Sequence, residues 1–232
     1  MIKILEYFIR KIKGENFTLD KEISIIYILN RVFLMVTNLI RGNIKTIFIK
    51  KKSNAIFIGR RTKLIDGKKI CFGNGINIGD NVIIDALSKN GILIGNNVRI
   101  GDYSRILCTG TLKNIGKGIK IGNNFGCGEN CFFGSAGGIE IGNDVIMGQD
   151  VRFHSENHNF SNTDVLIRLQ GVSNKGIYIG NNCWIGSGVV FLDGAELNDG
   201  CVVAANAVVT KKFPQNCVIG GIPAKIIKQR GK

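Results

Sequence analysis

The sequence predicts an all-β protein, a parallel β-helix with the cross-section of a triangular prism, from three observations. "IGNN" or a close variant returns at residues 94, 121, 141 and 179. Glycine is abundant, with 31 residues, whereas proline is rare, with 2. A period of six residues corresponds to a short strand followed by a corner, and three such units make one turn of the prism. The longest set of apolar residues at that period is Ile179, Ile185, Phe191, Leu197, Val203 and Val209.

Each unit is expected to place its recurring apolar residue inside the prism, and the residue four positions later inside as well. Asn, Asp and Gly then form the corners, because they adopt turn and left-handed backbone conformations at low cost. Successive turns stack as parallel strands, so the end turns need a cap. Shorter sets in the same phase are Ile94, Ile100 and Ile106; Ile121, Cys127 and Phe133; and Ile141, Met147 and Phe153.

Four of the seven cysteines fit this register, and the chain lacks the CxxC pair that would favour a metal site. Cys127 occupies the recurring apolar position. Free cysteine behaves as a small buried hydrophobe, so we expect inert thiols inside the prism. The second inward position holds Cys131, Cys183 and Cys201. The pattern assigns no place to Cys71, Cys108 and Cys217.

The repeat divides the chain into three segments. Residues 1–52 lack it and are expected to form a basic helical cap. Residues 53–222 are the predicted β-helix domain, with a loop insertion over residues 154–178. Residues 223–232 leave the repeat as a basic tail, for which we expect a short helix.

The N-terminal segment combines apolar and basic residues. It carries eleven Lys or Arg against four Asp or Glu, and its longest apolar run, residues 23–40, is interrupted by Asn30 and Arg31. A charge within the run disfavours a transmembrane helix. We therefore expect one or two helices that pack on the first turn of the prism, with peripheral membrane contact through residues 1–52 as the alternative. The expected location is the cytoplasm, with the inner face of the membrane as the site of any peripheral contact.

The formal charge of +14 suggests an anionic partner. A nucleic-acid partner is not expected, because the chain has no zinc-finger spacing, RNP-like aromatic motif or convincing helix-turn-helix.

The insertion contains the only two histidines of the chain, His154 and His158. The phase of the repeat jumps from Phe153 to Ile179, so a long loop leaves a rigid scaffold there. The stretch "HSENHNF" brings imidazole, carboxylate and amide groups together, which suits acid–base chemistry near neutral pH. Two imidazoles are too few for a three-histidine zinc site, so no metal is expected.

Three stretches carry a family resemblance: "NHNF" at 157–160, "WIG" at 184–186 and "VVTKKFPQNCVIGGIPAK" at 208–225. With them, residues 58–228 resemble the left-handed β-helix (hexapeptide-repeat) acyltransferases, and most closely the O-acetyltransferases of bacterial surface polysaccharides. The resemblance implies a left-handed coil, acetyl-CoA as acyl donor and a homotrimer whose active sites lie between neighbouring prisms.

The resemblance also implies roles for the loop residues. His158 matches the general base that takes the proton from the acceptor hydroxyl. Glu156, where some relatives carry a histidine, could orient the imidazole or contact the sugar. His154 and Asn157 are candidates for substrate binding, and His154 remains the alternative base.

Beyond the loop, the resemblance makes the backbone N–H of Ser187 the oxyanion donor. Trp184 would wall the acyl pocket, with core packing as the alternative. The residues implied to contact coenzyme A are Trp184, Ser187, Ala205, Thr210, Lys211, Lys225 and Lys228.

The expected function is transfer of acetyl from acetyl-CoA to a sugar hydroxyl of a bacterial surface polysaccharide, or of its lipid-linked or nucleotide precursor. One alternative is N-acetylation of an amino sugar nucleotide. The other is a non-catalytic β-helix scaffold at the membrane surface, which would show no thermal shift with coenzyme A.

Overall fold

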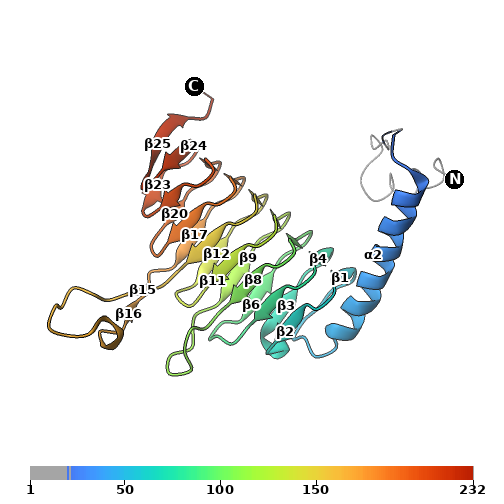
Figure 1. Ribbon diagram of the computed structural model, residues 1–232, viewed down its shortest axis with the longest axis horizontal. Helices are drawn as coiled ribbons and strands as arrows, with labels where there is room; N and C mark the ends of the chain where they lie inside the picture. Colours follow the sequence, from blue (N-terminus) through green and yellow to red (C-terminus); the bar gives the residue numbers. More distant parts are fainter. Residues whose placement is uncertain (1–19, 21, 232) are drawn as a thin grey trace.

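The computed structural model describes residues 20 and 22–231, and these form a parallel β-helix with one N-terminal helix and one projecting arm (Figure 1). Each turn of the chain adds one strand to each of three parallel sheets. The first sheet contains β1 (Ile56–Ile58), β4 (Ile76–Ile78), β7 (Arg99–Ile100), β10 (Gly126–Cys127), β13 (Ile146–Met147), β18 (Trp184–Ile185), β21 (Val202–Val203), β24 (Cys217–Gly221) and β25 (Ala224–Gln229).

The second sheet contains β2 (Lys63–Ile65), β5 (Ile83–Asp85), β8 (Arg105–Leu107), β11 (Phe132–Gly134), β14 (Arg152–His154), β19 (Val190–Leu192) and β22 (Val208–Val209). The third contains β3 (Ile70–Phe72), β6 (Ile92–Ile94), β9 (Ile119–Ile121), β12 (Ile139–Ile141), β17 (Ile177–Ile179), β20 (Glu196–Leu197) and β23 (Lys212–Phe213). The predicted parallel β-helix is confirmed, and its left-handedness stays a prediction.

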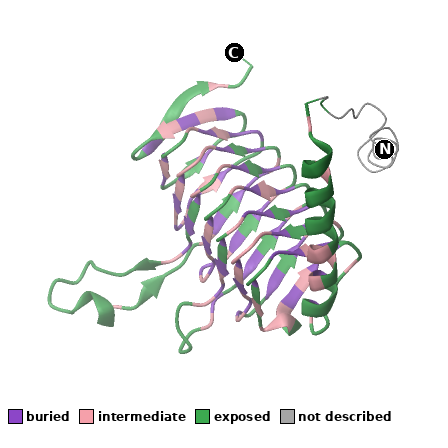
Figure 2. Ribbon diagram, turned by 45° about the vertical axis from the view of Figure 1, so that its right-hand side comes forward, coloured by how far each residue is buried: buried purple, intermediate pink, exposed green. Residues whose placement is uncertain are grey.

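The core is a single apolar column inside the prism, as the six-residue period predicts (Figure 2). Ile179, Ile185 and Leu197 are completely buried. Phenylalanine rings stack along the second sheet, with centroids 5.1 Å apart between Phe133 and Phe153 and 4.6 Å apart between Phe153 and Phe191. Stacking of identical positions on successive turns lets each ring bury its faces against the next.

One corner of the prism is held by a ladder of Asn side chains. The side-chain oxygen of Asn96 accepts a hydrogen bond from the N–H of Asn74 at 2.8 Å, and the same contact joins Asn96 to Asn123 and Asn123 to Asn143. The ladder ends at Asp199, whose carboxylate accepts from the N–H of Asn181. The corner residues therefore bond adjacent turns in addition to adopting the turn conformation.

The cysteines are free thiols, and the four that the sequence places inside the prism are buried. Two of the unassigned cysteines, Cys108 and Cys217, are buried as well, whereas Cys71 is half-buried. Burial raises the pKa of Cys183 to about 11 and that of Cys217 to about 12. These thiols are therefore protonated at neutral pH and poorly suited to act as nucleophiles.

Helix α2 (Ile25–Lys45) contacts the first turn of the prism only near its C-terminal end. Gly42 lies directly against the carbonyl group of Ile56, where a β-carbon would clash. The guanidinium of Arg41 donates to the carbonyl of Ile58 at 2.7 Å, and the amine of Lys45 donates to that of Thr62 at 2.8 Å. By length and composition alone, α2 is also long and apolar enough to cross a membrane. A second expected helix would fall in residues 1–19, outside the described residues.

The predicted C-terminal helix is wrong. Residues 224–229 form β25, which turns back at Gly221 and pairs antiparallel with β24. The physical reason is the exposed edge of β24, whose backbone groups would otherwise lack partners at the end of the first sheet. A strand satisfies those groups and closes the sheet, whereas a helix would leave them open.

Candidate active site

The predicted insertion is an arm that projects from the corner between the second and third sheets (Figure 1). It folds as a two-stranded antiparallel ribbon of β15 (Asn157–His158) and β16 (Val172–Ser173), with the short 3-10 helix η2 (Ile167–Leu169) between them. The prism itself continues through His154 in β14 and resumes at Ile177 in β17. The interruption is therefore shorter than the predicted residues 154–178.

His154 belongs to the prism rather than to the arm. It pairs in register with Gly134 on one side and Leu192 on the other, and its ring centroid lies 5.5 Å from that of Phe132. Partial burial, followed by the positive charge of Arg152, lowers the pKa of His154 below its ordinary value. His154 is thus a predominantly neutral imidazole beside the base of the arm.

His158 lies on β15, opposite Val172, and is exposed to solvent. No described residue hydrogen-bonds its imidazole, so the orientation by Glu156 that the sequence suggests is not formed in this chain. Glu156 is half-buried where the arm begins, and Asn157 is exposed and pairs with Ser173. The imidazole of His158 is therefore accessible to a substrate or to a neighbouring chain.

Both ends of the arm are fastened to the prism by residues that the family motifs did not indicate. The buried hydroxyl of Ser155 donates to the carbonyl of Gly134 at 2.8 Å and accepts from the N–H of Gly137 at 2.9 Å. On the return, the buried carboxylate of Asp193 accepts from the N–H groups of Lys175 and Gly176. A hexad register alone could have placed Asp193 at a corner, but not its contact with the arm.

The arm is also braced internally. The amide of Gln170 donates to the carbonyls of Asn162 and Val165, both at 2.7 Å, and its oxygen accepts from the N–H of Asn162. Several apolar side chains nevertheless remain exposed on this shaped loop. They are Phe160, Leu166, Ile167 and Leu169. The arm is thus a pre-formed element whose apolar surface is not covered by any residue that the structure describes.

A second group of predicted site residues lies on the first sheet and its corner toward the second sheet. Trp184 lies on β18 with 57% of its surface exposed, which rules out the alternative of plain core packing. With Ile146, Val202 and Arg230 it lines a hollow of about 350 Å³. An exposed indole on a rigid strand is free to contact a ligand or a neighbouring chain.

Ser187 follows Trp184 at the next corner. Its hydroxyl donates to the side-chain oxygen of Gln149 at 3.0 Å, while no described residue accepts a hydrogen bond from its backbone N–H. The N–H of Gln149, one turn earlier, is equally unpaired among the described residues. Ala205 is exposed at the same corner one turn later, where the N–H of Asn206 donates to the carbonyl of Ser187. This corner therefore offers a row of free backbone donors.

The basic positions predicted to contact coenzyme A lie toward the C-terminal end of the prism. Lys225 and Lys228 are exposed on β25, which extends the sheet of Trp184 through β21 and β24. Thr210 and Lys211 lie at the corner from which the arm leaves, with the Lys211 amine 5.7 Å from the ring centroid of Phe213. The residues predicted to bind coenzyme A thus share one end of the molecule.

The arm with His158 and the group that contains Trp184 and Ser187 do not meet within one chain. The arm leaves between the second and third sheets, whereas Trp184 lies on the first sheet and Ser187 lies between the first and second. No hydrogen bond among the described residues joins His158 to Trp184 or Ser187. One chain therefore carries two separate parts of the predicted site, on different corners of the prism.

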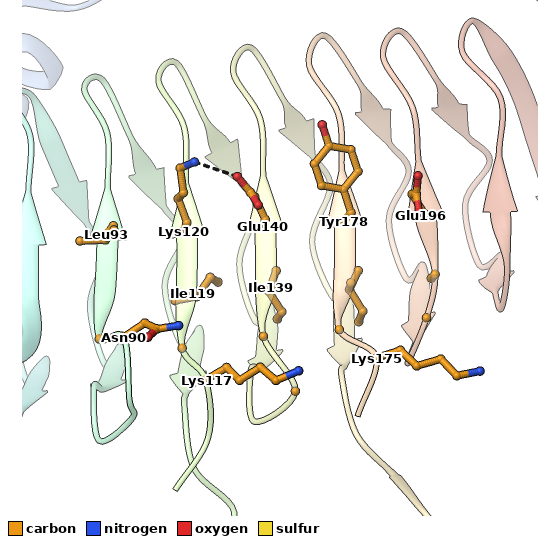
Figure 3. A pocket seen from close by; sticks show the side chains of 18 of the residues that line it. Asn90, Leu93, Lys117, Ile119, Lys120, Ile139, Glu140, Lys175, Tyr178 and Glu196 are labelled. Atoms are coloured by element: carbon orange, nitrogen blue, oxygen red, sulfur yellow. Dashed lines mark hydrogen bonds and ion pairs between the residues drawn. The ribbon is translucent and has the colours of Figure 1, made fainter. Parts of the chain in front are cut away.

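A groove of about 780 Å³ crosses the outer face of the third sheet beside the arm (Figure 3). Lys120 and Glu140 form an ion pair of 2.8 Å across it, next to the ring of Tyr178. Lys117 and Lys175 lie at the end nearest the arm, and neither has a carboxylate partner among the described residues. Motif reasoning missed these residues, because they occupy outward and corner positions that the repeat leaves free.

Within residues 20 and 22–231, no three His, Cys, Asp or Glu side chains are grouped so that they could hold a metal ion.

Comparison with known proteins places this geometry in a class. Residues 176–211 match the family model "Bacterial transferase hexapeptide (six repeats)". The chain is 28% identical over 167 residues to the Escherichia coli (strain K12) protein named "Putative lipopolysaccharide biosynthesis O-acetyl transferase WbbJ", which covers 69% of this chain and 71% of that protein. It is 33% identical over 115 residues to the galactoside O-acetyltransferase of the same organism, covering 49% of this chain and 55% of that relative.

Among solved structures, a mutant of AntD, an N-acyltransferase from Bacillus cereus crystallised with dTDP and coenzyme A, superimposes with a TM-score of 0.57. The superposition covers 74% of this chain and 85% of AntD at 20% identity, so it supports the fold. Together these findings confirm the resemblance that the three motifs predict, to the hexapeptide-repeat acyltransferases. This chain is therefore similar in sequence and in fold to acyltransferases built on a β-helix.

Proposed function

We propose that this protein transfers an acetyl group from acetyl-CoA to a hydroxyl of a sugar in a bacterial surface polysaccharide, or of its lipid-linked or nucleotide precursor. The observation that carries the proposal is the fastened arm with the exposed imidazole of His158, to which no described residue hydrogen-bonds. The similarity to WbbJ supports the polysaccharide, and AntD supports coenzyme A as donor.

The chemistry requires one proton acceptor and one donor to the oxyanion. The imidazole of His158 takes the proton of the acceptor hydroxyl as its oxygen attacks the thioester carbon. The backbone N–H of Ser187 donates to the oxyanion that forms. This N–H suits that task, because no described residue accepts a hydrogen bond from it. The C–S bond then breaks, the new ester leaves, and the proton passes from His158 to the thiolate of coenzyme A. No acyl-enzyme forms.

We further propose that the active site is completed in a homotrimer with a left-handed coil. The separation of the arm from Trp184 and Ser187 within one chain supports this, because a neighbouring prism can supply the missing part. The exposed Phe160, Leu166 and Leu169 support it too, since an interface would bury them. Lys211, Lys225 and Lys228 would then meet the phosphates of coenzyme A, and Thr210 and Ala205 its pantetheine arm.

The acceptor in this proposal is anionic. Lys117 and Lys175 have no described carboxylate partner beside the arm, which suits a sugar diphosphate or a lipid-linked diphosphate sugar. Glu156, Asn157 and His154 surround the base of the arm and would contact the sugar hydroxyls. The expected location is the cytoplasm, at the inner face of the membrane.

The test is release of coenzyme A from acetyl-CoA, measured against a panel of nucleotide-linked and lipid-linked sugars. His158→Ala should lose roughly 100-fold or more in kcat, because general base catalysis is removed. Its thermal shift with coenzyme A should equal that of the wild type. Turnover within a few-fold of the wild type would overturn the assignment of the base.

The same assay separates the proposal from its two alternatives. A product that hydrolyses in mild base is an ester, whereas an amide persists and would indicate an N-acetyltransferase. A wild-type protein that shows no thermal shift with coenzyme A, and no turnover with any sugar, would be a scaffold.

A further inference from the structure

Helix α2 exposes its apolar side to solvent, whereas an ordinary surface helix buries that side against the protein core. Its contacts with the prism run through polar groups, namely the guanidinium of Arg41, the amine of Lys45 and the backbone at Gly42. A helix that packs on a protein core normally buries its apolar stripe and exposes its polar side. In this chain the C-terminal part of the helix turns its polar side toward the prism, and the apolar stripe faces outward.

The outward stripe is continuous along the helix, which is about 30 Å long. Its members recur at helical spacing and cover an arc of about 100°. They are Ile25, Leu29, Phe33, Val36, Ile40 and Ile44, with exposed fractions from 41% for Ile25 to 67% for Phe33. Figure 2 shows the helix exposed along most of its length at the end of the prism. So large an apolar surface indicates contact with an apolar partner.

The positive charge of the residues that follow the helix indicates the kind of partner that covers the stripe. Immediately after the helix, Ile47 and Phe48 are 62% and 80% exposed, and the exposed Lys50, Lys51 and Lys52 follow them. Residues 41–69 contain ten Lys or Arg and a single acidic residue, Asp66. A stripe of apolar side chains followed in the chain by a run of exposed lysines is a pattern that binds a bilayer rich in anionic lipid.

The polar side of α2 argues for a position in the plane of the membrane surface. Arg31, Asn38 and Lys45 lie on the side opposite the stripe, which the exposed Tyr27 and Leu34 share. Asn30, Thr37 and Arg41 lie between that side and one edge of the stripe. A helix that spanned the bilayer would carry Arg31 into lipid at a high cost in free energy. Lying flat instead, the helix buries its stripe and leaves these groups with the headgroups and the prism.

We propose that α2 is an in-plane anchor that binds this protein to an anionic membrane surface, with Phe48 and Lys50–Lys52 as its basic and aromatic border. This inference does not rest on the acetyl transfer, because it uses none of the residues assigned to that reaction. It adds a reason for the chain to meet a lipid-linked acceptor, since the anchor and the arm belong to the same chain.

The experiment is flotation of the full chain with vesicles of phosphatidylcholine, with and without phosphatidylglycerol. The wild type should float with the anionic vesicles alone and should be released at high salt. Phe33→Ser/Ile40→Ser should lose roughly tenfold or more of its affinity, because apolar burial is removed. Lys50→Glu/Lys51→Glu/Lys52→Glu should lose at least roughly tenfold through charge. Leu112→Ser changes an 82% exposed leucine outside the helix and should bind as the wild type does.

Each other outcome overturns the proposal. If the wild type ignores anionic vesicles, or Phe33→Ser/Ile40→Ser floats as well as the wild type, α2 is no anchor. If that variant instead lowers the number of copies measured by light scattering, with no vesicle binding by the wild type, a second copy covers the stripe. Resistance of the membrane-bound protein to an alkaline wash would indicate a spanning helix. Since none of these readouts involves coenzyme A, they are independent of the acetyl-transfer assay.

Discussion

The carboxylate of Asp193 accepts hydrogen bonds of 2.8 and 3.0 Å from the backbone N–H of Lys175, and a further one of 2.8 Å from the N–H of Gly176. Asp193 belongs to the prism turn that follows the arm, and Lys175 is the residue at which the arm returns. The contact therefore fixes the end of the arm to the next turn of the scaffold. Charge-assisted hydrogen bonds of this kind are stronger than neutral ones.

Asp193→Ala should loosen the arm and lower kcat for acetyl transfer by roughly tenfold or more, because misplacement of His158 costs rate steeply. The free energy of unfolding should also fall by about 1–3 kcal/mol, since the backbone N–H groups of Lys175 and Gly176 lose their acceptor. The affinity for coenzyme A should not change, which marks Asp193 as a positioning residue. Steady-state kinetics, urea unfolding and a coenzyme A thermal shift measure the three quantities.

The control is Asp199→Ala, which removes the same type of contact, from a carboxylate to the N–H of Asn181, at a corner remote from the arm. It should lower stability but not kcat measured on the folded fraction. Equal losses of kcat in the two variants would show that Asp193 acts only through stability.

The scaffold was predictable because the period of the repeat expresses one physical requirement, an apolar side chain at every inward position. Phe153, Phe191 and Val209 keep that phase and are buried as it predicts. The tail escaped prediction because β25 is specified by the free edge of β24, a tertiary feature that "PAKIIKQ" does not reveal. A repeating residue pattern predicts the repeating strands, whereas the structure of the last segment depends on the sheet edge beside which it lies.

The candidate site was predictable only in part, for the same reason. The motifs identified His158 and Trp184, because each lies within a short stretch that resembles the family. They could not identify Ser155 and Asp193, whose role arises from contacts with backbone groups of other turns. Nor could they show that α2 exposes its apolar stripe, because a helical pattern gives the same arc whichever side meets the prism.

The stacked rings at the centre of the second sheet should dominate the stability of the prism. Phe153→Ala leaves a void between Phe133 and Phe191 and should lower the free energy of unfolding by about 3–5 kcal/mol. Leu112→Ala, at an 82% exposed position, should change it by less than about 0.5 kcal/mol. Urea unfolding followed by circular dichroism measures both. A Phe153→Ala variant as stable as Leu112→Ala would contradict the stacked core.

The imidazole of His154 should titrate below the ordinary pKa of histidine. Burial and the charge of Arg152 hold the pKa of His154 below its ordinary value of 6.5. The unfolded chain therefore binds this proton more readily than the folded one, so the free energy of unfolding rises with pH in the window below about 6.5 and is level above it. Proton NMR of His158→Gln, which retains one histidine, measures the pKa directly. Arg152→Gln should raise it, and a value above 6.5 in the parent variant would contradict the packing of His154.

The buried thiols should be unreactive in the folded protein. Burial raises the pKa of Cys183 to about 11 and that of Cys217 to about 12, so very little thiolate exists at neutral pH. Iodoacetamide should label the half-buried Cys71 first, as read by peptide mass spectrometry. All seven should react after unfolding in guanidinium, which is the control. Labelling of Cys183 in the folded protein as fast as Cys71 would contradict its place in the core.

The separation of His158 from Trp184 and Ser187 in one chain leads to a complementation test of the proposed trimer. His158→Ala removes the base from the arm, and Trp184→Ala removes the wall from the first sheet. If each site takes its arm from one copy and its wall from the next, mixed assemblies regain intact sites. Random mixing of equal amounts should restore roughly a quarter of all sites, because each half is intact with a chance of one half, and roughly a third of the sites in trimers that contain both variants.

The two variants should be co-expressed with different affinity tags, and assemblies that carry both tags should be purified before kcat is measured. Each variant alone provides the baseline. A chain that carries both substitutions, co-expressed with the wild type, checks that mixing itself does not impair turnover. Recovery far above the baseline requires that the arm of one copy serve the sheet of another. If the mixed assemblies remain at the baseline while the wild type is active, the arm must fold back on its own prism, and the site must form within one chain.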